Sequence, residues 1–230
     1  MSRPLVIAHR GASGYEVENS LAAFRAARSL GADAVELDVH ATADGALFVH
    51  HDETIDHVHH IPHSTAEQVQ QLRLSNGESI PLLADALGAI GARLEVFVEI
   101  KSLAPQYDDR LFDVLDHGPN PPGYAIHSFD HRIVRRLGTK RPAIRRGVLS
   151  SAYLVRPLAA LEDAGATILW QERTLVDESL ARTIHQADCR LIAWTVDQPQ
   201  EMRRLIGLGV DGICTNFPDI ARRAVDGLRA

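Results

Sequence analysis

Short apolar runs that end abruptly in ionisable residues recur along this chain, and this pattern most constrains its fold. The run before His9 and the run before Glu36 are separated by a helix-like segment, residues 20–30. A strand, a crossover helix and a second strand form the basic unit of parallel α/β folds. Because the carboxyl ends of parallel strands meet at one mouth, we expect the charged residues after each run to gather there.

The same unit repeats to the end of the chain. Apolar runs followed by helix-like segments begin near residues 5, 34, 96, 124, 145, 167, 191 and 211. This alternation, without a break in composition, favours a closed (β/α)8 TIM barrel, one domain over residues 1–230, over a two-domain arrangement. A short irregular insertion is expected after the second strand: Asp44-Gly45 predicts a hairpin that adds a strand at 46–50, and residues 57–79 contain one short helix at 65–72.

Composition limits the partners. The formal net charge of −6 gives no electrostatic argument for nucleic acid or for an anionic membrane surface. The first apolar run is short and no run approaches the roughly 20 apolar residues of a membrane helix, so we expect neither a secretory signal nor stable membrane insertion. Cys189 and Cys214 suit small buried side chains better than a disulfide. A cytoplasmic protein is expected, and the sequence carries no indication of its oligomeric state.

Three carboxylates follow predicted strands. Glu36 and Asp38 are two residues apart, so on a strand both point to one side, where they would repel each other unless a proton or a cation lay between them. Glu99 ends another predicted strand. Any one of these acids alone would suit a solvated strand end, but three at one mouth favour a site for a hard cation, Mg²⁺ or Ca²⁺, over a zinc site.

Imidazoles and fixed cations are expected at the same mouth. His9 and His51 are candidates for proton transfer, because imidazole titrates near neutral pH. Arg10 and Lys101 supply donors of the kind that hold phosphate oxygens. Together with a metal, these groups indicate phosphoryl-group chemistry.

Motifs in this order resemble the glycerophosphodiester phosphodiesterase family. The most specific of them lie in the first 52 residues: His9-Arg10-Gly11, Glu18-Asn19-Ser20, Gly31-Ala32-Asp33, Glu36-Leu37-Asp38-Val39, Asp44-Gly45 and His51-Asp52. Individually weaker motifs continue the likeness: Glu99-Ile100-Lys101, Ser128-Phe129-Asp130, Ala193-Trp194-Thr195-Val196 and the segment from Gly212 to Pro218. The resemblance therefore covers nearly the whole chain.

The resemblance implies a barrel enzyme that hydrolyses glycerophosphodiesters, small-molecule substrates, to glycerol 3-phosphate and an alcohol. Residue by residue, it implies that Glu36, Asp38 and Glu99 hold the divalent cation, with Glu18 nearby. The family usually has Pro-Glu-Asn-Thr where this chain has Val17-Glu18-Asn19-Ser20, a change that keeps the carboxylate and a hydroxyl cap for the next helix.

The same resemblance implies the remaining roles. His9 and His51 would be the general acid/base pair, Arg10 and Lys101 would bind phosphate oxygens, and Trp194 would line the pocket beside the glycerol. By analogy, the glycerol 2-hydroxyl attacks phosphorus first, and water then opens a cyclic phosphate. That order of events is a hypothesis.

One segment departs from the family pattern. After His51-Asp52-Glu53-Thr54 the family typically has Leu-Asp-Arg and a threonine- and glycine-rich loop, whereas residues 55–63 read IDHVHHIPH. Contacts to the alcohol head group are therefore expected to differ, at a fairly open site. Histidines of this loop offer an alternative, a transition-metal site, although a solvated loop is favoured because the spacing fits no standard zinc pattern: His57, His59, His60 and His63, with His50 or His51.

Two rival functions differ in what the mouth must provide. A related lipid-directed phosphodiesterase, of the lysophospholipase D or sphingomyelinase D kind, needs an apolar surface there, and an aromatic content of 5% argues mildly against one. A barrel that only binds phosphodiesters has no need of two proton-transfer groups, so His9 and His51 argue against it.

Overall fold

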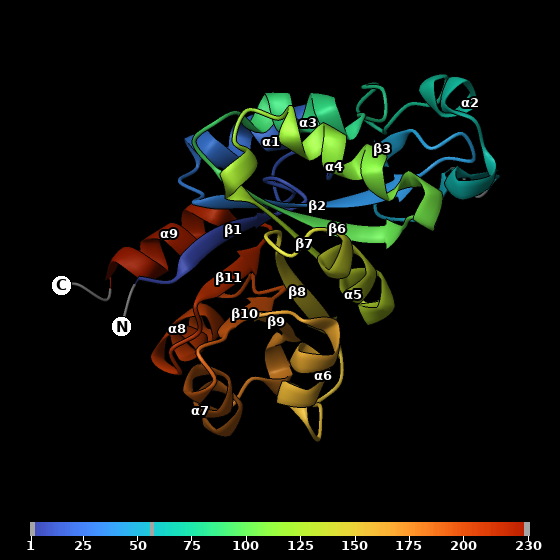
Figure 1. The fold of residues 1–230 in the computed structure, drawn as a ribbon. Helices are drawn as coiled ribbons and strands as arrows, with labels where there is room; N and C mark the ends of the chain where they lie inside the picture. Colours follow the sequence, from blue (N-terminus) through green and yellow to red (C-terminus); the bar gives the residue numbers. More distant parts are fainter. Residues whose placement is uncertain (1–2, 56–57, 228–230) are drawn as a thin grey trace.

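The computed structural model describes residues 3–55 and 58–227, and its centre is a closed barrel of parallel strands (Figure 1). Each strand pairs in parallel with the next, and β1 closes the barrel by pairing with both β2 and β11. The strands are β1 (Leu5–His9), β2 (Ala34–Ala41), β6 (Glu95–Ser102), β7 (Tyr124–Ser128), β8 (Arg145–Ser150), β9 (Ile168–Glu172), β10 (Arg190–Trp194) and β11 (Gly212–Thr215). The predicted (β/α)8 TIM barrel is confirmed.

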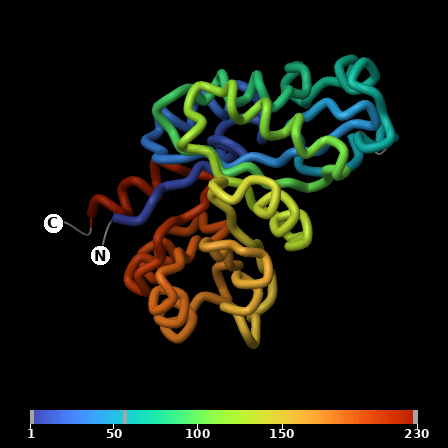
Figure 2. Tube along the Cα trace, in the orientation of Figure 1, coloured from blue at the N-terminus to red at the C-terminus, as the bar shows by residue number. Residues whose placement is uncertain are grey.

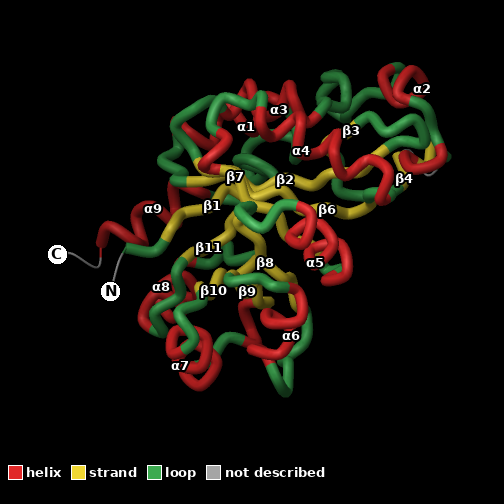
Figure 3. The backbone as a smooth tube through the Cα atoms, in the orientation of Figure 1, coloured by secondary structure: helices red, strands yellow, loops and turns green. Residues whose placement is uncertain are grey.

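Helices follow the strands and cover the outside of the barrel (Figure 3). They are α1 (Leu21–Ser29), α3 (Leu83–Ile90), α4 (Asp108–Asp116), α5 (His131–Lys140), α6 (Pro157–Ala164), α7 (Glu178–Gln186), α8 (Pro199–Gly207) and α9 (Pro218–Asp226). Polar side chains set several of their first turns: the Ser20 hydroxyl accepts from the Ala23 backbone N–H at 3.0 Å, and Asp130 accepts from that of Arg132. Asp177 caps α7 in the same way, accepting from the Leu180 backbone N–H.

Strand periodicity separates the barrel wall from its interior. On β2, Val35 and Leu37 face outward and pack in the apolar layer under the helices. The alternate residues face inward, so Glu36 and Asp38 share the interior side, as the sequence predicted. Below them the interior is filled by apolar side chains from most strands, among them Ile7, Phe97, Ile168 and Ile192. The floor of the barrel is therefore apolar, and polar interior positions are concentrated toward the carboxyl ends of the strands.

The segment between β2 and α3 forms a lobe beside the barrel mouth. It contains β3 (Leu47–Val49), which lies within the predicted strand and pairs antiparallel with β2, then β4 (Thr54–Ile55), β5 (His59–His60) and α2 (Ala66–Gln70). Gly45 at the hairpin has φ +81°, a conformation that glycine adopts without strain. Phe48, Ile61 and Val69 give the lobe its own small apolar core, so the loop that carries His51 rests on a packed base.

The two ends of the described chain meet, because α9 packs beside β1 (Figure 2). Cys214 is buried inside the barrel, Cys189 is half-buried, and both are free thiols. No helix within the described ranges has the length and apolar character needed to cross a lipid bilayer.

Candidate active site

A pocket opens at the carboxyl ends of the barrel strands, where the sequence placed its charged residues. Its cavity measures ≈ 60 Å³. The lining side chains are His9, Arg10, Glu36, His51, Glu99, Lys101, His127, Phe129, Leu149, Trp170, Trp194 and Cys214. All but one of the predicted site residues thus meet in one pocket, and the exception, Asp38, is buried in contact with two of them.

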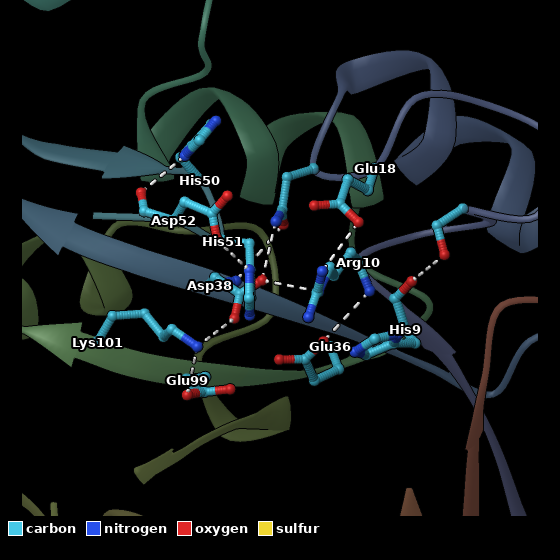
Figure 4. A network of polar contacts seen from close by, with 12 residues as sticks. His9, Arg10, Glu18, Glu36, Asp38, His50, His51, Asp52, Glu99 and Lys101 are labelled. Carbon is cyan, nitrogen blue, oxygen red and sulfur yellow. Dashed lines mark hydrogen bonds and ion pairs between the residues drawn. The ribbon is translucent and has the colours of Figure 1, made fainter. Parts of the chain in front are cut away.

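Asp38 is an anion held between cations. Its carboxylate lies 3.2 Å from Arg10 Nε and 3.6 Å from Lys101 Nζ, and it accepts a hydrogen bond from Asn19 Nδ2 at 2.9 Å (Figure 4). Burial alone would raise its pKa, but Arg10, then Lys101 and the Asn19 hydrogen bond, hold the pKa below its ordinary value. Asp38 therefore stays charged and fixes both cations at the mouth.

The carboxylates of Glu36 and Glu99 are less well stabilised by neighbouring cations and hydrogen-bond donors than that of Asp38. Burial, and next the charge of Asp38, raise the pKa of each to about 7. Glu36 Oε2 accepts from the Arg10 backbone N–H at 3.2 Å, and Glu99 Oε1 lies 3.0 Å from Lys101 Nζ. A bound cation would relieve the repulsion among these carboxylates, so the donor set fits a divalent metal ion.

His127 joins this pair, and the sequence reasoning missed it. Glu36, Glu99 and His127 each offer one ligand atom, all within 4.8 Å of one another; within residues 3–55 and 58–227 no other group of three or more such side chains does so. Strand periodicity was the available signal: Tyr124 and Ile126 face outward, so Ala125 and His127 face the interior. In the sheet register His127 lies beside Glu99, which lies beside Asp38.

His9 is oriented by a chain of hydrogen bonds. Asn216 donates from Nδ2 to Asp197 Oδ2 at 2.7 Å, which turns its amide oxygen toward His9 Nδ1, also 2.7 Å away. That oxygen can only accept, so Nδ1 carries the proton and Nε2 keeps its lone pair. Ser13 Oγ donates to the same amide oxygen. Sequence reasoning missed Asp197 and Asn216, which lie in the loops after β10 and β11.

His51 has a different partner. Its Nδ1 lies 2.8 Å from Asp52 Oδ1, and this hydrogen bond holds the pKa of Asp52 below its ordinary value. His51 therefore contacts a carboxylate, whereas His9 contacts a neutral amide. The Nδ1 atom of the adjacent His50 lies 2.8 Å from the Asp52 carbonyl oxygen, and His50 lies away from Glu36 (Figure 4). His50 lines a second groove, which His51 also lines.

Arg10 and Lys101 present positive charge to the pocket. Arg10 adopts a left-handed backbone conformation, φ +55°, which is uncommon for a residue with a side chain and directs its backbone N–H to Glu36. Its Nη1 donates to Glu18 Oε2 at 2.9 Å, so Glu18, expected near the metal, contacts Arg10. Both cations are thus anchored by carboxylates on one side and open to the pocket on the other.

The opposite wall is apolar and aromatic. Trp194 contacts Phe129 edge to face, with ring centroids 5.4 Å apart. Trp170 is both a pocket wall and a core residue: it is 1% exposed, lines the pocket and packs on His127. Leu149 completes the wall.

The histidine-rich loop does not assemble a second centre in the part of the chain that the structure describes. His60 stacks on His63 with centroids 4.3 Å apart, and its Nε2 lies 3.3 Å from Glu53 Oε1. Neither these two nor His59 belongs to a described group of three metal-binding side chains. His57, part of the alternative transition-metal site, lies outside the described residues.

A closed (β/α)8 barrel with carboxylates, imidazoles and fixed cations at its carboxyl-terminal mouth defines a class of enzyme, one that acts on phosphate esters. Comparison with known proteins supplies the family. Residues 9–220 match the model of the glycerophosphoryl diester phosphodiesterase family, so the chain belongs to that family and is a phosphoric diester hydrolase. The family resemblance noted in the sequence is therefore confirmed.

Individual members of the family are similar to this chain over nearly their full lengths. A glycerophosphodiester phosphodiesterase of Caldanaerobacter subterraneus is 34% identical over 94% of this chain and 96% of that protein. A solved phosphodiesterase of Oleispira antarctica, in complex with the product sn-glycerol-3-phosphate, is similar at TM-score 0.89 and 25% identity, covering 97% of both chains. A glycerophosphodiester phosphodiesterase structure from Parabacteroides distasonis is similar at TM-score 0.89 over 99% of both chains.

Proposed function

We propose that this enzyme hydrolyses glycerophosphodiesters to sn-glycerol 3-phosphate and an alcohol, with a divalent cation and two histidines. The convergence of two differently partnered imidazoles with three carboxylates, an arginine and a lysine at one mouth carries the proposal. Family membership supports it, as does the product bound by the similar Oleispira antarctica structure. The cytoplasmic location expected from the sequence stays a prediction.

Glu36 and Glu99 would hold the cation, Mg²⁺ or Ca²⁺ by the sequence prediction, with Asp38 as the third ligand. Asp38 Oδ1 has no hydrogen-bond partner among the described residues, and its 3.6 Å separation from Lys101 Nζ leaves a lone pair for that role. When bound, the cation would neutralise charge on the phosphoryl oxygens. Arg10 and Lys101 would bind the other oxygens, since both project from the anchoring carboxylates into the pocket.

The two sides of the pocket would bind different ends of the substrate. The glycerol moiety would lie against Trp194 and Phe129, whose apolar faces suit its carbon chain. The alcohol would leave on the His51 side, where a groove of ≈ 400 Å³ is lined by Glu18, His50, His51 and Arg73, among others. Because this groove belongs partly to the lobe that departs from the family pattern, head-group preference would be set there.

The hydrogen-bond partners of His9 and His51 support different proton-transfer roles for the two histidines. His9, with the Nε2 lone pair free, would take the proton of the glycerol 2-hydroxyl as its oxygen attacks phosphorus. His51, oriented by its hydrogen bond with Asp52, would donate a proton to the alcohol oxygen as the bond from phosphorus to that oxygen breaks. Water would then open the cyclic phosphate, giving its proton to His51, while His9 returns its proton to the 2-oxygen.

Release of glycerol 3-phosphate tests the reaction. A coupled assay would follow this product from glycerophosphocholine and from glycerophosphoglycerol, with and without a chelator. We expect release that stops on chelation and returns with added divalent cation. No release from any glycerophosphodiester, or release that chelation leaves unchanged, would contradict the proposal.

A diester with a good leaving group tests the separate histidine roles. p-Nitrophenolate leaves without protonation, so His51→Ala should release it from glycerol 3-phosphate p-nitrophenyl ester at a rate near wild type and accumulate the cyclic phosphate. His9→Ala should stay slow on the same ester, because the attacking hydroxyl still needs a base. Equal losses in both variants would refute this division of roles.

A lipid-directed phosphodiesterase remains the second candidate, and one observation favours it. The loops after β7 and β8, on the mouth side of the barrel, expose Phe129 at 45%, Tyr153 at 44% and Val155 at 96%. Apolar side chains in these loops suit an acyl chain. Assay of lysophosphatidylcholine beside glycerophosphocholine separates the candidates: faster turnover of the lipid would favour the second.

A further inference from the structure

His127 has no side-chain hydrogen bond within the described residues, although it is almost fully buried. It is 1% exposed, and neither Nδ1 nor Nε2 has a hydrogen-bond partner. Buried polar side chains are hydrogen-bonded in the great majority of cases, so two unsatisfied ring nitrogens require an explanation. An imidazole nitrogen that binds a metal ion would be one.

The ring is aimed at the carboxylates. His127 Nε2 lies 3.6 Å from Glu36 Oε1, and the group that it forms with Glu36 and Glu99 spans no more than 4.8 Å. A cation about 2.1 Å from each donor would bring donor atoms to separations of roughly 3–4 Å, so small side-chain movements suffice. The three residues come from the adjacent strands β2, β6 and β7.

Aromatic packing holds the imidazole in this orientation. Trp170 meets the ring edge to face with centroids 4.3 Å apart, and Phe97 stacks on it at 6.4 Å. Gly147 on β8 leaves room for the indole, since a Cβ there would lie 2.9 Å from Trp170 Cδ1.

We propose that His127 is itself a ligand of the cation, with Glu36 and Glu99, and that this nitrogen donor makes the site prefer Mn²⁺ to Ca²⁺. The inference rests on the proposed function for its cation site, and it changes the all-oxygen ligand set expected from the sequence. Calcium and magnesium take oxygen ligands almost exclusively, whereas imidazole suits first-row transition metals. Mn²⁺ accepts both donor types.

The alternative is a histidine that only fills space above the barrel floor. Its shape would then matter for packing between Trp170 and Phe97, but its nitrogens would not affect which ion binds. The two interpretations differ in metal selectivity and in the ligand spectrum of the ion, neither of which requires an activity measurement.

The experiment uses the full chain and Mn²⁺ as a spectroscopic probe. Pulsed electron paramagnetic resonance detects a directly bound imidazole through its ¹⁴N coupling to the ion, and calorimetry gives the affinities for Mn²⁺ and Ca²⁺. The variants are His127→Gln, which keeps a polar side chain of similar length, and His185→Gln as the matched control. His185 contacts Asp211, which precedes β11 at the opposite end of the barrel, with Nε2 3.0 Å from Oδ2.

We expect an imidazole coupling in wild type and in His185→Gln, and none in His127→Gln. The Mn²⁺ affinity of His127→Gln should fall at least about tenfold relative to its Ca²⁺ affinity, since even an outer-shell partner of a metal site is typically worth about 10–100-fold. Mn²⁺ bound to wild type without nitrogen coupling would overturn the inference, whether or not His127→Gln folds. A coupling that persists in His127→Gln would do the same.

A further variant distinguishes a failure of the His127 role from a failure of the proposed cation site as a whole. Glu36→Gln should lose most Mn²⁺ and Ca²⁺ binding, because it removes a carboxylate common to both ligand sets. If wild type bound neither ion, the cation site and the role of His127 would fail together. If it bound both with equal affinity and no nitrogen coupling, only the role of His127 would fail.

Discussion

The two halves of the pocket differ sharply in charge. Six ionisable lining residues come from β1, β2, β6 and the loops after β1 and β3: His9, Arg10, Glu36, His51, Glu99 and Lys101. The apolar lining residues come later in the chain: Phe129, Leu149, Trp170, Trp194 and Cys214. His127 on β7 stands at the boundary. One half therefore carries the groups that move protons and bind phosphate, and the other offers apolar surface. The difference indicates that chemistry and glycerol recognition are assigned to separate halves.

The free-energy cost of burying a charge explains why the charged side chains are grouped in one half of the pocket. An isolated buried charge is strongly destabilising, whereas Asp38 is surrounded by Arg10, Lys101 and Asn19. The apolar half excludes water and so lowers the local dielectric constant, which strengthens each electrostatic contact in the charged half. Substitutions in the charged half should change kcat, and those in the apolar half should change KM.

The largest effect is expected at His9. His9→Ala removes a proton-transfer group, so kcat should fall by at least ~10²-fold, the usual scale for such groups, with the fold intact. Steady-state kinetics on glycerophosphocholine and a thermal melt measure both. His185→Ala, at the other end of the barrel, is the control and should retain wild-type turnover. An unchanged kcat in His9→Ala would break the assignment of chemistry to the charged half.

Cation binding should stabilise the fold, because it relieves repulsion among Glu36, Glu99 and Asp38. At a concentration 100-fold above its dissociation constant, a ligand stabilises by about 2.7 kcal/mol. For a chain of this size, that corresponds to a rise in Tm of about 5–10 °C. Differential scanning fluorimetry with Mn²⁺ measures the shift. Glu36→Gln should reduce it, and an equal shift in that variant would place the ion elsewhere.

Asp197 tests the comparison between the two halves further, because it contacts His9 only through Asn216 and does not line the pocket. It fixes the Asn216 amide that orients His9, so Asp197→Ala should lower kcat by about 10–100-fold, the scale for an outer partner of a functional imidazole, with KM nearly constant. Asp197→Asn keeps an acceptor and should recover part of the loss. If KM rose while kcat stayed at the wild-type value, Asp197 would be placed in substrate binding.

The smallest effect belongs to the apolar half. Trp194→Ala removes an aromatic contact worth about 0.5–1.5 kcal/mol, so KM should rise up to about tenfold with little change in kcat. Trp194→Phe should lie near wild type. Initial rates over a range of glycerophosphocholine concentrations separate the two constants, and a loss confined to kcat would contradict the division between the halves.

Local periodicity accounts for the part of the site that the sequence predicted. Two-residue spacing placed Glu36 and Asp38 on one side of β2, and strand ends placed His9, Glu99 and Lys101 at the same mouth. The barrel itself followed from repeated alternation. These inferences needed no knowledge of which strands are neighbours beyond the topology of the fold.

What the sequence did not predict depends on contacts across the closed barrel. Asn216 reaches His9 only because β11 pairs with β1, over two hundred residues away in the chain. His127 faces the carboxylates because β7 lies beside β6 in a particular register. A histidine in an apolar strand is ambiguous until that register is known, and the same holds for the pairing of Asp38 with cations.

A crystal structure with Mn²⁺ and sn-glycerol 3-phosphate tests the central division most directly. The account predicts an anomalous peak between Glu36 and Glu99, phosphate oxygens on Arg10 and Lys101, and glycerol carbons against Trp194. An ion bound away from Glu36, or glycerol directed toward His51 and the lobe with the phosphate on the aromatic wall, would contradict it.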